Sequence, residues 1–541
     1  MRSVAWTFAG SLLLWLSQSM LPQPALARDF YIDPVAGSPS GDGSRAAPWR
    51  TLQEVVDSGL IETRHWSSLP YADGATLAPV NPGAPVQPGD TLWLLSGFHG
   101  ALDLTGAYNA APITVAAAPG ATPKLSHVFL RAASGWVLRG LSVSPSYAPS
   151  DERRTAVEFD AHGFQGPTSD ILIEDCQIFS VDDSSGWSAS DWVALAVDGI
   201  VSDGDDITAQ RNTLTNVRFG ISMSGERARV LHNSIRNFSG DGMRGLGDDG
   251  LFEGNYVANC YDVDDNHDDG FQSWSVGPDG VGSGEVRRMT LRGNMIVNRE
   301  DPSQPLAGPL QGIGCFDGYF TDWVVENNVI LVDHWHGITL LGARGSRIVN
   351  NTVMDINGDR PGPPWIKIAP HKDGTEGRGN LVRNNLATAI ANEGRGVLED
   401  HNLIIDDPSA FFVGPSAPWD LHLRRGAAPV DSGSADMAPA TDRDGVPRPF
   451  GAAVDIGAYE WTDAPPPLDA GAVDAGAADA GASGDAGPSG EDGSVDAGGE
   501  GGGDMGCGCT TPGRPVGAGA WPLLVLAAWR ARRGRRPADR R

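Results

Sequence analysis

A short pattern recurs through the middle of the chain and restricts its fold more than any other feature. Each copy has alternating apolar residues, then Asn or Asp, one variable residue and a further apolar residue; the marked positions are Asp175, Asn212, Asn233, Asn255, Asn294, Asn328 and Asn351, with a looser copy at Asn384. The shortest intervals are 21, 22 and 23 residues, and the longer ones carry insertions. A unit this short cannot bury its own apolar face, so the units must stack into a solenoid. We expect the asparagines to form a structural ladder.

The composition of the repeats selects the kind of solenoid. A leucine-rich repeat has a similar period but needs a Leu-rich signature and a helix in each unit, whereas these units have alternating Val and Ile and glycine turns. We therefore predict an all-β fold, a right-handed parallel β-helix over residues 28–461. Thr51 and Glu54 fit a capping box, which predicts a short N-terminal helix that covers the open first coil.

Two segments near the ends of this body resemble a known family. The stretches FYIDPVAGSPSGDGSRAAPWRTLQEVVDSG and VQPGDTLWLLSGFHG look like the head of the pectate-lyase-like β-helix superfamily. The stretches DLHLRRGAAPVDSG and TDRDGVPRPFGAAVDIGAYEW are similar to the closing segment of many secreted members. With the Asn repeats, the resemblance covers most of residues 29–461 and implies the same fold.

The two ends of the chain have a different character. Residues 1–27 have the charged, apolar and small-residue order of a secretory signal peptide, so we expect a secreted protein. Residues 462–506 form an acidic Ala/Gly/Asp segment that predicts a disordered linker. Residues 507–541 resemble the myxobacterial C-terminal sorting tail (Myxo-CTERM type), which implies display at the cell surface, associated with the outer membrane through this tail. An unprocessed membrane anchor is the alternative.

The charge balance and the cysteines restrict partners and covalent chemistry. A net charge of −28 argues against nucleic acid as a partner, because phosphate-binding surfaces need clustered Lys and Arg. The body has three cysteines, Cys176, Cys260 and Cys315, so at least one has no partner there, and we expect buried free thiols. We expect a monomer that meets a membrane only through its tail.

A second recurring element, Xaa-Gly followed by an apolar residue, predicts where a site lies. Stacking places the residues before these glycines in one column: Asp241, Asp269, Gln311 and His336. Because strand residues alternate, the residue two positions after each glycine should face outward. This predicts an outward row of Ser222, Arg244, Gln272, Gly314, Thr339 and Lys367, with Met243, Phe271 and Ile366 buried.

The segment VDDNHDDGFQSW, residues 263–274, leads into one of these outward strands. Calcium binds six to eight oxygens, and clustered carboxylates at a turn can supply several of them. The candidate calcium ligands are Asp264, Asp265, Asp268, Asp269 and Asp241. The alternative is a solvated acidic turn.

The residue types of the row suit chemistry on an acidic polysaccharide. The segment HDDGFQSW followed by QGI resembles segments in β-helix proteins of the polysaccharide lyase and uronan epimerase type. β-Elimination from a uronic acid must neutralise a carboxylate, remove the C5 proton and protonate the leaving oxygen. The candidate catalytic residues are Lys367 or His267 as base, Arg244 as ligand of the substrate carboxylate, and His336. The candidate substrate-binding residues are Gln272, Trp274, Gln311, His334 and Trp335.

Two other functions stay open at this point. A glycoside hydrolase would use two carboxylic acids, for which Asp241, Asp269 and Asp317 are candidates. A non-catalytic glycan-binding adhesin would need only aromatic and Asn-rich faces. The gathering of Lys, Arg, His and Asp on one row favours an enzyme, and a calcium-assisted polysaccharide lyase is the leading hypothesis.

Overall fold

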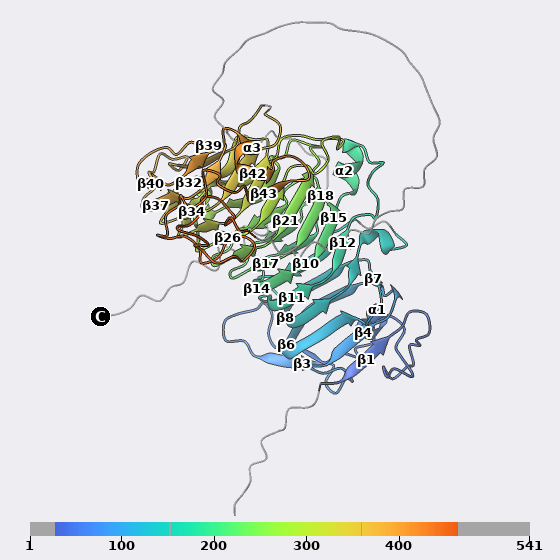
Figure 1. Ribbon diagram of the computed structural model, residues 1–541. Coiled ribbons are helices and arrows are strands. Elements are labelled where there is room, and N and C mark those ends of the chain that lie inside the picture. The colour runs from blue at the N-terminus through green and yellow to red at the C-terminus, as the bar shows by residue number, and fades with distance from the viewer. Residues whose placement is uncertain (1–26, 151–152, 359, 464–541) are drawn as a thin grey trace, which may run out of the picture.

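The computed structural model describes residues 27–150, 153–358 and 360–463. They form a parallel β-helix whose coils follow one another in chain order along the length of the molecule (Figure 1). Each coil contributes one strand to each of three parallel faces, and every strand pairs with the equivalent strands of the coils before and after it. The prediction of an all-β solenoid is confirmed.

The faces are named here by their strands. The first face consists of β10 (Val157–Asp160), β13 (Ile200–Ser202), β16 (Ile221–Met223), β19 (Met243–Gly245), β22 (Asp269–Trp274), β28 (Gln311–Asp317), β32 (His336–Leu341), β36 (Trp365–Ala369) and β39 (Ala389–Ile390). The second face consists of β1 (Asp29–Ile32), β4 (Thr91–Leu94), β11 (Ser169–Glu174), β14 (Asp205–Gln210), β17 (Arg229–Leu231), β20 (Leu251–Glu253), β26 (Thr290–Arg292), β30 (Val324–Glu326), β34 (Arg347–Val349), β37 (Asn380–Arg383) and β40 (Val397–Asp400). The third face consists of β5 (Gly97–Phe98), β7 (Pro123–Leu125), β9 (Ser142–Val143), β12 (Gln177–Phe179), β15 (Thr213–Val217), β18 (Ser234–Phe238), β21 (Tyr256–Cys260), β27 (Met295–Val297), β31 (Val329–Val332), β35 (Thr352–Asp355), β38 (Leu386–Ala387) and β41 (Leu403–Ile404).

Long strands join the first two faces near the N-terminal end. The strands β6 (Leu102–Ala117) and β8 (Val128–Arg139) pair along their length. The first part of β8 pairs with β10 of the first face and its last part pairs with β11 of the second. The shorter additions are the β2 (Thr63–Trp66) and β3 (Leu77–Val80) hairpin, the β23 (Val276–Gly277) and β24 (Gly280–Val281) hairpin, a small sheet of β25 (Glu285–Arg287), β29 (Tyr319–Thr321) and β33 (Ala343–Arg344), and the pair β42 (Phe412–Gly414) and β43 (Asp420–Leu423).

The core lies between the three faces and is built from stacked apolar side chains. The inward row of the first face is buried throughout: Ile200, Ile221, Met243, Phe271, Ile313, Ile338 and Ile366 are each at most 1% exposed. Burial of such side chains is the dominant favourable contribution to folding, about 1.5–3 kcal/mol for each. The expected burial of Met243, Phe271 and Ile366 is confirmed.

The asparagine ladder is present, with two positions shifted by one residue. Each ladder carbonyl accepts hydrogen bonds from the backbone N–H and the side-chain amide of the preceding rung, as Asn233 Oδ1 does from Asn212 at 3.0 Å each. The rungs are Asn212, Asn233, Asn255, Asn294, Asn328, Asn351, Asn385 and Asn402. Asp175 and Asn384, assigned to the ladder from the sequence, instead have φ of 57° and 55° and precede it by one residue. Cys176, whose backbone N–H donates to Asn212 Oδ1, occupies the first rung.

The described residues contain three α helices, α1 (Leu52–Asp57), α2 (Ala189–Leu195) and α3 (Pro408–Phe411), and the 3-10 helix η1 (Pro145–Tyr147). The predicted N-terminal helix is α1; Thr51 Oγ1 accepts the N–H of Glu54, and Leu52 and Val55 enter the core near the first coils. Cys176, Cys260 and Cys315 are buried free thiols, as expected.

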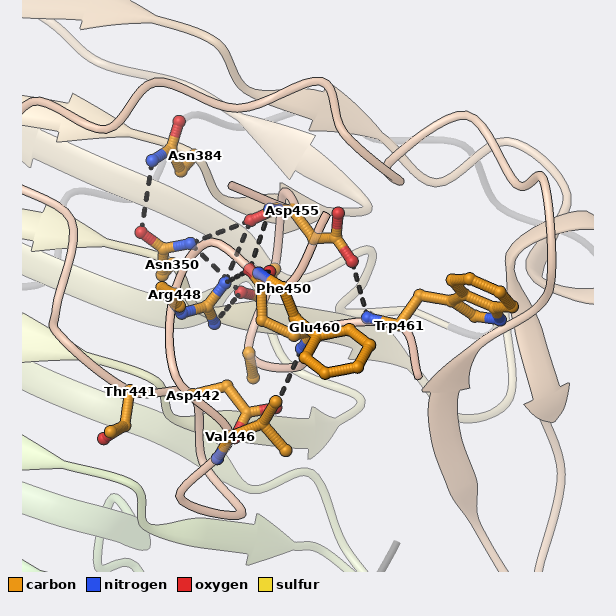
Figure 2. A network of polar contacts seen from close by, with 12 residues as sticks. Asn350, Asn384, Thr441, Asp442, Val446, Arg448, Phe450, Asp455, Glu460 and Trp461 are labelled. Carbon is orange, nitrogen blue, oxygen red and sulfur yellow. Dashed lines mark hydrogen bonds and ion pairs between the residues drawn. The ribbon is translucent and has the colours of Figure 1, made fainter. Parts of the chain in front are cut away.

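The closing segment, residues 405–461, folds back over the third face. Its apolar side chains, including Phe411, Phe412 and Tyr459, pack on the outward residues Leu331 and Met354 of that face. Polar contacts hold it to the corner of the coils, where the Asn350 amide donates to the carbonyls of Asp455 and Gly457 (Figure 2).

Arg448 lies at the centre of these contacts, with its guanidinium 2.6 Å from Glu460 Oε1 and both side chains 1% exposed (Figure 2). Burial lowers the pKa of Arg448, against the effect of the Glu460 carboxylate. The carboxylate oxygens around it accept backbone N–H groups: Glu460 Oε2 from Phe450, Asp455 Oδ2 from Trp461, and Asp442 Oδ2 from Glu460. The closing segment is therefore held in place by the buried Arg448 guanidinium and by the hydrogen-bonded carboxylates around it.

The predictions for the signal peptide, the linker and the tail fall, except for residues 27, 462 and 463, outside the described residues. None of the helices in the described part of the chain has the length and apolar character that a membrane-spanning helix needs.

Candidate functional site

The predicted outward row exists on the first face. Strand register pairs Ser222 with Arg244, Arg244 with Gln272, Gln272 with Gly314, Gly314 with Thr339 and Thr339 with Lys367. Arg244 and Lys367 keep part of their side chains exposed, 19% and 15%, whereas Thr339 is fully buried by its neighbours. The period of the repeats thus placed the row correctly.

We call the outward row from Ser222 to Lys367, with the side chains that flank it, the strip; Arg244 lies near its N-terminal end. Its Nε donates to Asp241, whose side chain is fully buried. Its guanidinium lies over the ring of Phe219, 3.6 Å from the centroid, and 5.5 Å from the ring of Trp274. Cation–π contact of this kind fixes a guanidinium while leaving part of its edge free for hydrogen bonds.

The acidic segment divides into an exposed and a buried half. Asp264, Asp265 and His267 are exposed, whereas Asp268 and Asp269 are 6% and 0% exposed. The helix α2 lies beside the start of this loop, because Trp192 stacks on Tyr261 at 4.5 Å. His267 therefore lies on the solvent-exposed part of this loop.

The buried carboxyls of this loop are electrostatically unusual. Burial raises the pKa of Asp268 to about 7, and burial together with the Asp241 charge raises the pKa of Asp269 well above its ordinary value. Burial also raises the pKa of Asp241, against the opposing effect of Arg244. Groups with such shifts cluster at functional sites, although ion-pair networks produce them too.

Only one of the two carboxyl oxygens of Asp269 is hydrogen-bonded by a side chain of the described residues. Its Oδ2 accepts a hydrogen bond of 3.0 Å from Gln272 Nε2, and its buried Oδ1 has no hydrogen-bond partner among the described residues. A Cβ on Gly314 would lie 2.1 Å from that Oδ1 and 2.8 Å from the ring of Phe316. Glycine is needed at position 314 because the Asp269 carboxyl and the Phe316 ring fill the space that a side chain would occupy.

The carboxylates predicted to bind calcium do not converge. In the described ranges, no three His, Cys, Asp or Glu side chains are arranged to hold a metal ion. Asp268 accepts from Asn266 and from the Cys260 thiol, and Asp241 is paired with Arg244. The geometry gives no support to a calcium site at Asp264, Asp265, Asp268, Asp269 and Asp241, and calcium binding stays a prediction.

Histidine, tryptophan and lysine side chains gather at the C-terminal end of the strip. The rings of His334 and His336 stack at 5.1 Å, and Trp335 and Trp365 stack at 6.2 Å. The Lys367 ammonium lies 4.9 Å from the Trp365 ring centroid and 2.6 Å from Glu393 Oε1. Trp335 is 40% exposed, which leaves an aromatic surface of the kind that sugar rings stack against.

The charges of this group act on one another. Burial and the nearby charge of His267 lower the pKa of His334 to about 4. Burial, and then the charges of His334, Lys367 and His267, lower the pKa of His336 to about 3. The imidazoles of His334 and His336 are therefore neutral at neutral pH, and each can donate one N–H to a bound anion.

Two predicted assignments need correction on distance and burial. Arg244 and Lys367 lie four strand spacings apart, about 19 Å, and their side chains point away from each other, toward Phe219 and Glu393. They cannot act on the same sugar ring. Gln311 is 6% exposed, so its side chain does not reach a substrate from this position.

Some residues of the strip were missed by the sequence reasoning. Phe219, Phe316 and Trp365 supply much of its aromatic lining. Trp365 pairs with His336 only because the register between β32 and β36 shifts between His336 and Ile338. The period could not have placed Phe316 either, because the register between β22 and β28 shifts next to it.

Comparison with known proteins agrees with this architecture. A family model described as "Right handed beta helix region" matches residues 198–364, which include the row except for Lys367. The body is a right-handed parallel β-helix. No curated protein matches the sequence.

Solved structures show only distant likeness. Pectate lyase Pel9A is 14% identical with a TM-score of 0.41, over 80% of this chain and 96% of that one. XylC in complex with xylose is 9% identical with a TM-score of 0.47, over 80% and 99%. The GH136 lacto-N-biosidase from Eubacterium ramulus is 14% identical with a TM-score of 0.39, over 70% and 68%. Likeness at this level does not decide among reactions.

Proposed function

We propose that this protein is a secreted, surface-displayed enzyme that cleaves an acidic, uronic-acid polysaccharide by β-elimination on the strip of the first face. The observation that carries the proposal is the gathering of His267, His334, His336 and Lys367 at one place on a chain of net charge −28. A local group of donors and cations in an acidic protein suits an anionic substrate.

The strip also has the length and the aromatic side chains that a chain of sugars needs. The row continues over at least five coils, with Phe219, Trp274, Phe316, Trp335 and Trp365 distributed along it. A polymer lying along the helix axis would meet Arg244 and the His334/His336 group at different sugar residues. Arg244 would then hold a second uronate, and Gln272 would bind the sugars between them.

His267 is the proposed base. It is exposed, and it lies near enough to His334 and His336 for its charge to lower the pKa of both. In the reaction His267 takes the C5 proton, the C5–H electron pair becomes the C4=C5 double bond, and the C4–O bond breaks. The imidazolium then returns the proton to the leaving oxygen, while His334, His336 and Lys367 hold the carboxylate.

A glycoside hydrolase is the second candidate, and the carboxyl groups favour it. Hydrolysis needs one carboxylic acid that stays protonated and one that is ionised. The raised pKa of Asp269 and the Arg244 partner of Asp241 would suit these two roles. Asp241 and Asp269 are buried, however, so neither faces a substrate directly, and Asp317, whose side chain is 30% exposed, is paired with Lys372 at 2.9 Å.

The deciding experiment incubates the full-length protein with uronic-acid polymers and with neutral glycans. Ultraviolet absorbance of an unsaturated product and new reducing ends are followed together. Both signals on an acidic polymer support the lyase. Reducing ends without absorbance indicate the hydrolase, and binding without either signal indicates a glycan-binding protein. His65, exposed on β2, provides the control variant His65→Gln.

A further inference from the structure

A chain of hydrogen bonds runs beneath the histidine group and ends on His336. Trp365 Nε1 lies 3.0 Å from Thr339 Oγ1, and Thr339 Oγ1 lies 3.0 Å from His336 Nδ1. Thr339 is 0% exposed, so water does not reach its hydroxyl. The three groups come from the neighbouring strands β32 and β36, which hold them rigidly in register.

The direction of these bonds follows from the chemistry of the groups. An indole N–H can only donate, so Thr339 Oγ1 accepts from Trp365. The Thr339 hydroxyl must then donate its own hydrogen, and within the described residues its only other partner is His336 Nδ1. If His336 Nδ1 carried a proton, the buried hydroxyl hydrogen would have no acceptor, which costs about 1–3 kcal/mol.

We infer that the Trp365–Thr339–His336 chain holds His336 in the tautomer with its proton on Nε2, and that His336 presents this N–H to an anionic oxygen of the substrate. His336 Nε2 forms no hydrogen bond with the described residues and is not among the buried unpaired nitrogens, so it is open to a ligand. This N–H donates and cannot remove a proton. His336 is thereby assigned as an electrophilic donor, and Thr339 as its positioning residue.

The neighbouring ring, that of His334, has the same tautomer. His334 Nδ1 accepts the backbone N–H of His336 at 3.2 Å, so a neutral His334 also carries its proton on Nε2. The burial that keeps both rings neutral preserves their tautomers. Two stacked neutral N–H donors suit a carboxylate, or the oxyanion that develops on it when the C5 proton leaves. This assignment of the ligand rests on the proposed function, whereas the tautomer does not.

The test uses the full-length protein labelled with 15N-histidine. Nitrogen shifts distinguish a protonated from an unprotonated ring nitrogen, and the difference spectrum with His336→Gln identifies the signals of His336. At neutral pH we expect His336 to have an unprotonated Nδ1 and a protonated Nε2. Thr339→Val, which keeps the shape and removes the hydroxyl, should give averaged shifts from both tautomers, and Thr339→Ser should restore the wild-type pattern.

A protonated Nδ1 in the wild type, or an unchanged pattern in Thr339→Val, overturns the inference. On a cleaved acidic polymer, Thr339→Val should lower kcat by about 10-fold or more while KM changes little, because a transition-state donor is disordered, and Thr339→Ser should recover it. Loss of activity in both variants with an intact tautomer would also contradict the role of Thr339. If the expected tautomers are found and no acidic polymer is cleaved, the proposed function fails and the hydrogen-bond chain stands.

Discussion

The closing segment and the strip of the first face both bury charged side chains, but the hydrogen-bond partners of these side chains differ between the two regions. Around Arg448 the carboxylate oxygens of Glu460, Asp455 and Asp442 accept hydrogen bonds from backbone N–H groups or from the guanidinium. At the strip, Asp269 Oδ1 and Gln311 Oε1 are buried and have no hydrogen-bond partner among the described residues. Paired carboxylates hold the closing segment, where Arg448 Nε is itself buried without a partner among the described residues, whereas unpaired carboxyl and amide oxygens weaken the fold on the strip.

The two regions also differ in which polar and charged side chains they leave exposed to solvent. The closing segment directs its polar groups inward, toward Asn350 and the other corner residues of the coils. The strip leaves parts of Arg244, Trp335 and Lys367 at the surface, together with two imidazoles that burial and neighbouring charges keep neutral. The difference supports a structural role for the first region and a binding role for the second. Variants in the two regions should therefore affect different measurements.

The largest expected effect is on turnover. His267→Gln should lower kcat on the cleaved polymer by about 10²–10⁴, the usual contribution of a general base. Stability should change by less than about 0.5 kcal/mol, because the residue is exposed. The measurement is steady-state kinetics beside chemical denaturation, with His65→Gln as the control. Normal turnover in His267→Gln would remove this residue from the mechanism.

The next effect is on the closing segment. Glu460→Gln leaves the buried Arg448 guanidinium without its charged partner and should cost about 3–5 kcal/mol of folding stability. Glu54→Gln, which breaks the more exposed Arg50–Glu54 pair, should cost about 1 kcal/mol or less. Denaturation midpoints check both. Equal losses of folding stability in the two variants would contradict a stabilising role specific to the buried Arg448–Glu460 pair.

The sequence predicted the fold and the row because both depend on a period. Stacking at 21–23 residues fixes which positions lie above one another, and alternation fixes which of them face outward, as Arg244, Gln272 and Lys367 do. The same reasoning misplaced Asp175 and Asn384 by one residue, because several turns have polar residues at adjacent positions and only backbone geometry separates the φ-positive residue from the rung.

The site could be predicted only in part. The repeat period predicts the coil on which a residue lies. It does not predict how far the side chain extends or how deeply it is buried. The acidic run looked like one cluster in the sequence, and the loop divides it into exposed Asp264 and Asp265 and buried Asp268 and Asp269. The bonds that link Trp365, Thr339 and His336 depend on rotamers, which no spacing encodes.

A pH effect tests the burial of Asp268, although Asp455 of the closing segment, whose pKa burial raises to about 6, contributes in the same direction. The folded-state pKa of Asp268 is about 7, above the ordinary value of about 3.9, so between these values the folded protein holds one more proton than the unfolded chain. Its contribution to stability is therefore complete below about pH 4 and is lost as the pH rises to about 7.

Asp268→Asn should abolish that loss, which amounts to at most about 4 kcal/mol. Melting temperatures of wild type and variant between pH 4 and 7 should diverge toward neutral pH. Asp264→Asn on the same loop is exposed and should follow the wild type. Parallel curves for Asp268→Asn and the wild type would contradict the burial of this carboxyl as a source of instability.

The smallest expected effect concerns calcium. The described carboxylates of the strip do not converge on a common point, and Asp241 and Asp268 already have partners in Arg244 and Asn266. We therefore expect a chelator to change the melting temperature by less than about 2 °C, a shift too small for a tightly bound ion, since ligand at 100 times its Kd adds about 2.7 kcal/mol. Calcium added back should likewise leave the melting curve and the turnover unchanged. A drop of several degrees with chelator, reversed by calcium and absent in Asp269→Asn, would instead establish the metal site that the acidic run predicts, and would move Asp269 from a supporting position beneath Phe316 to the centre of the chemistry.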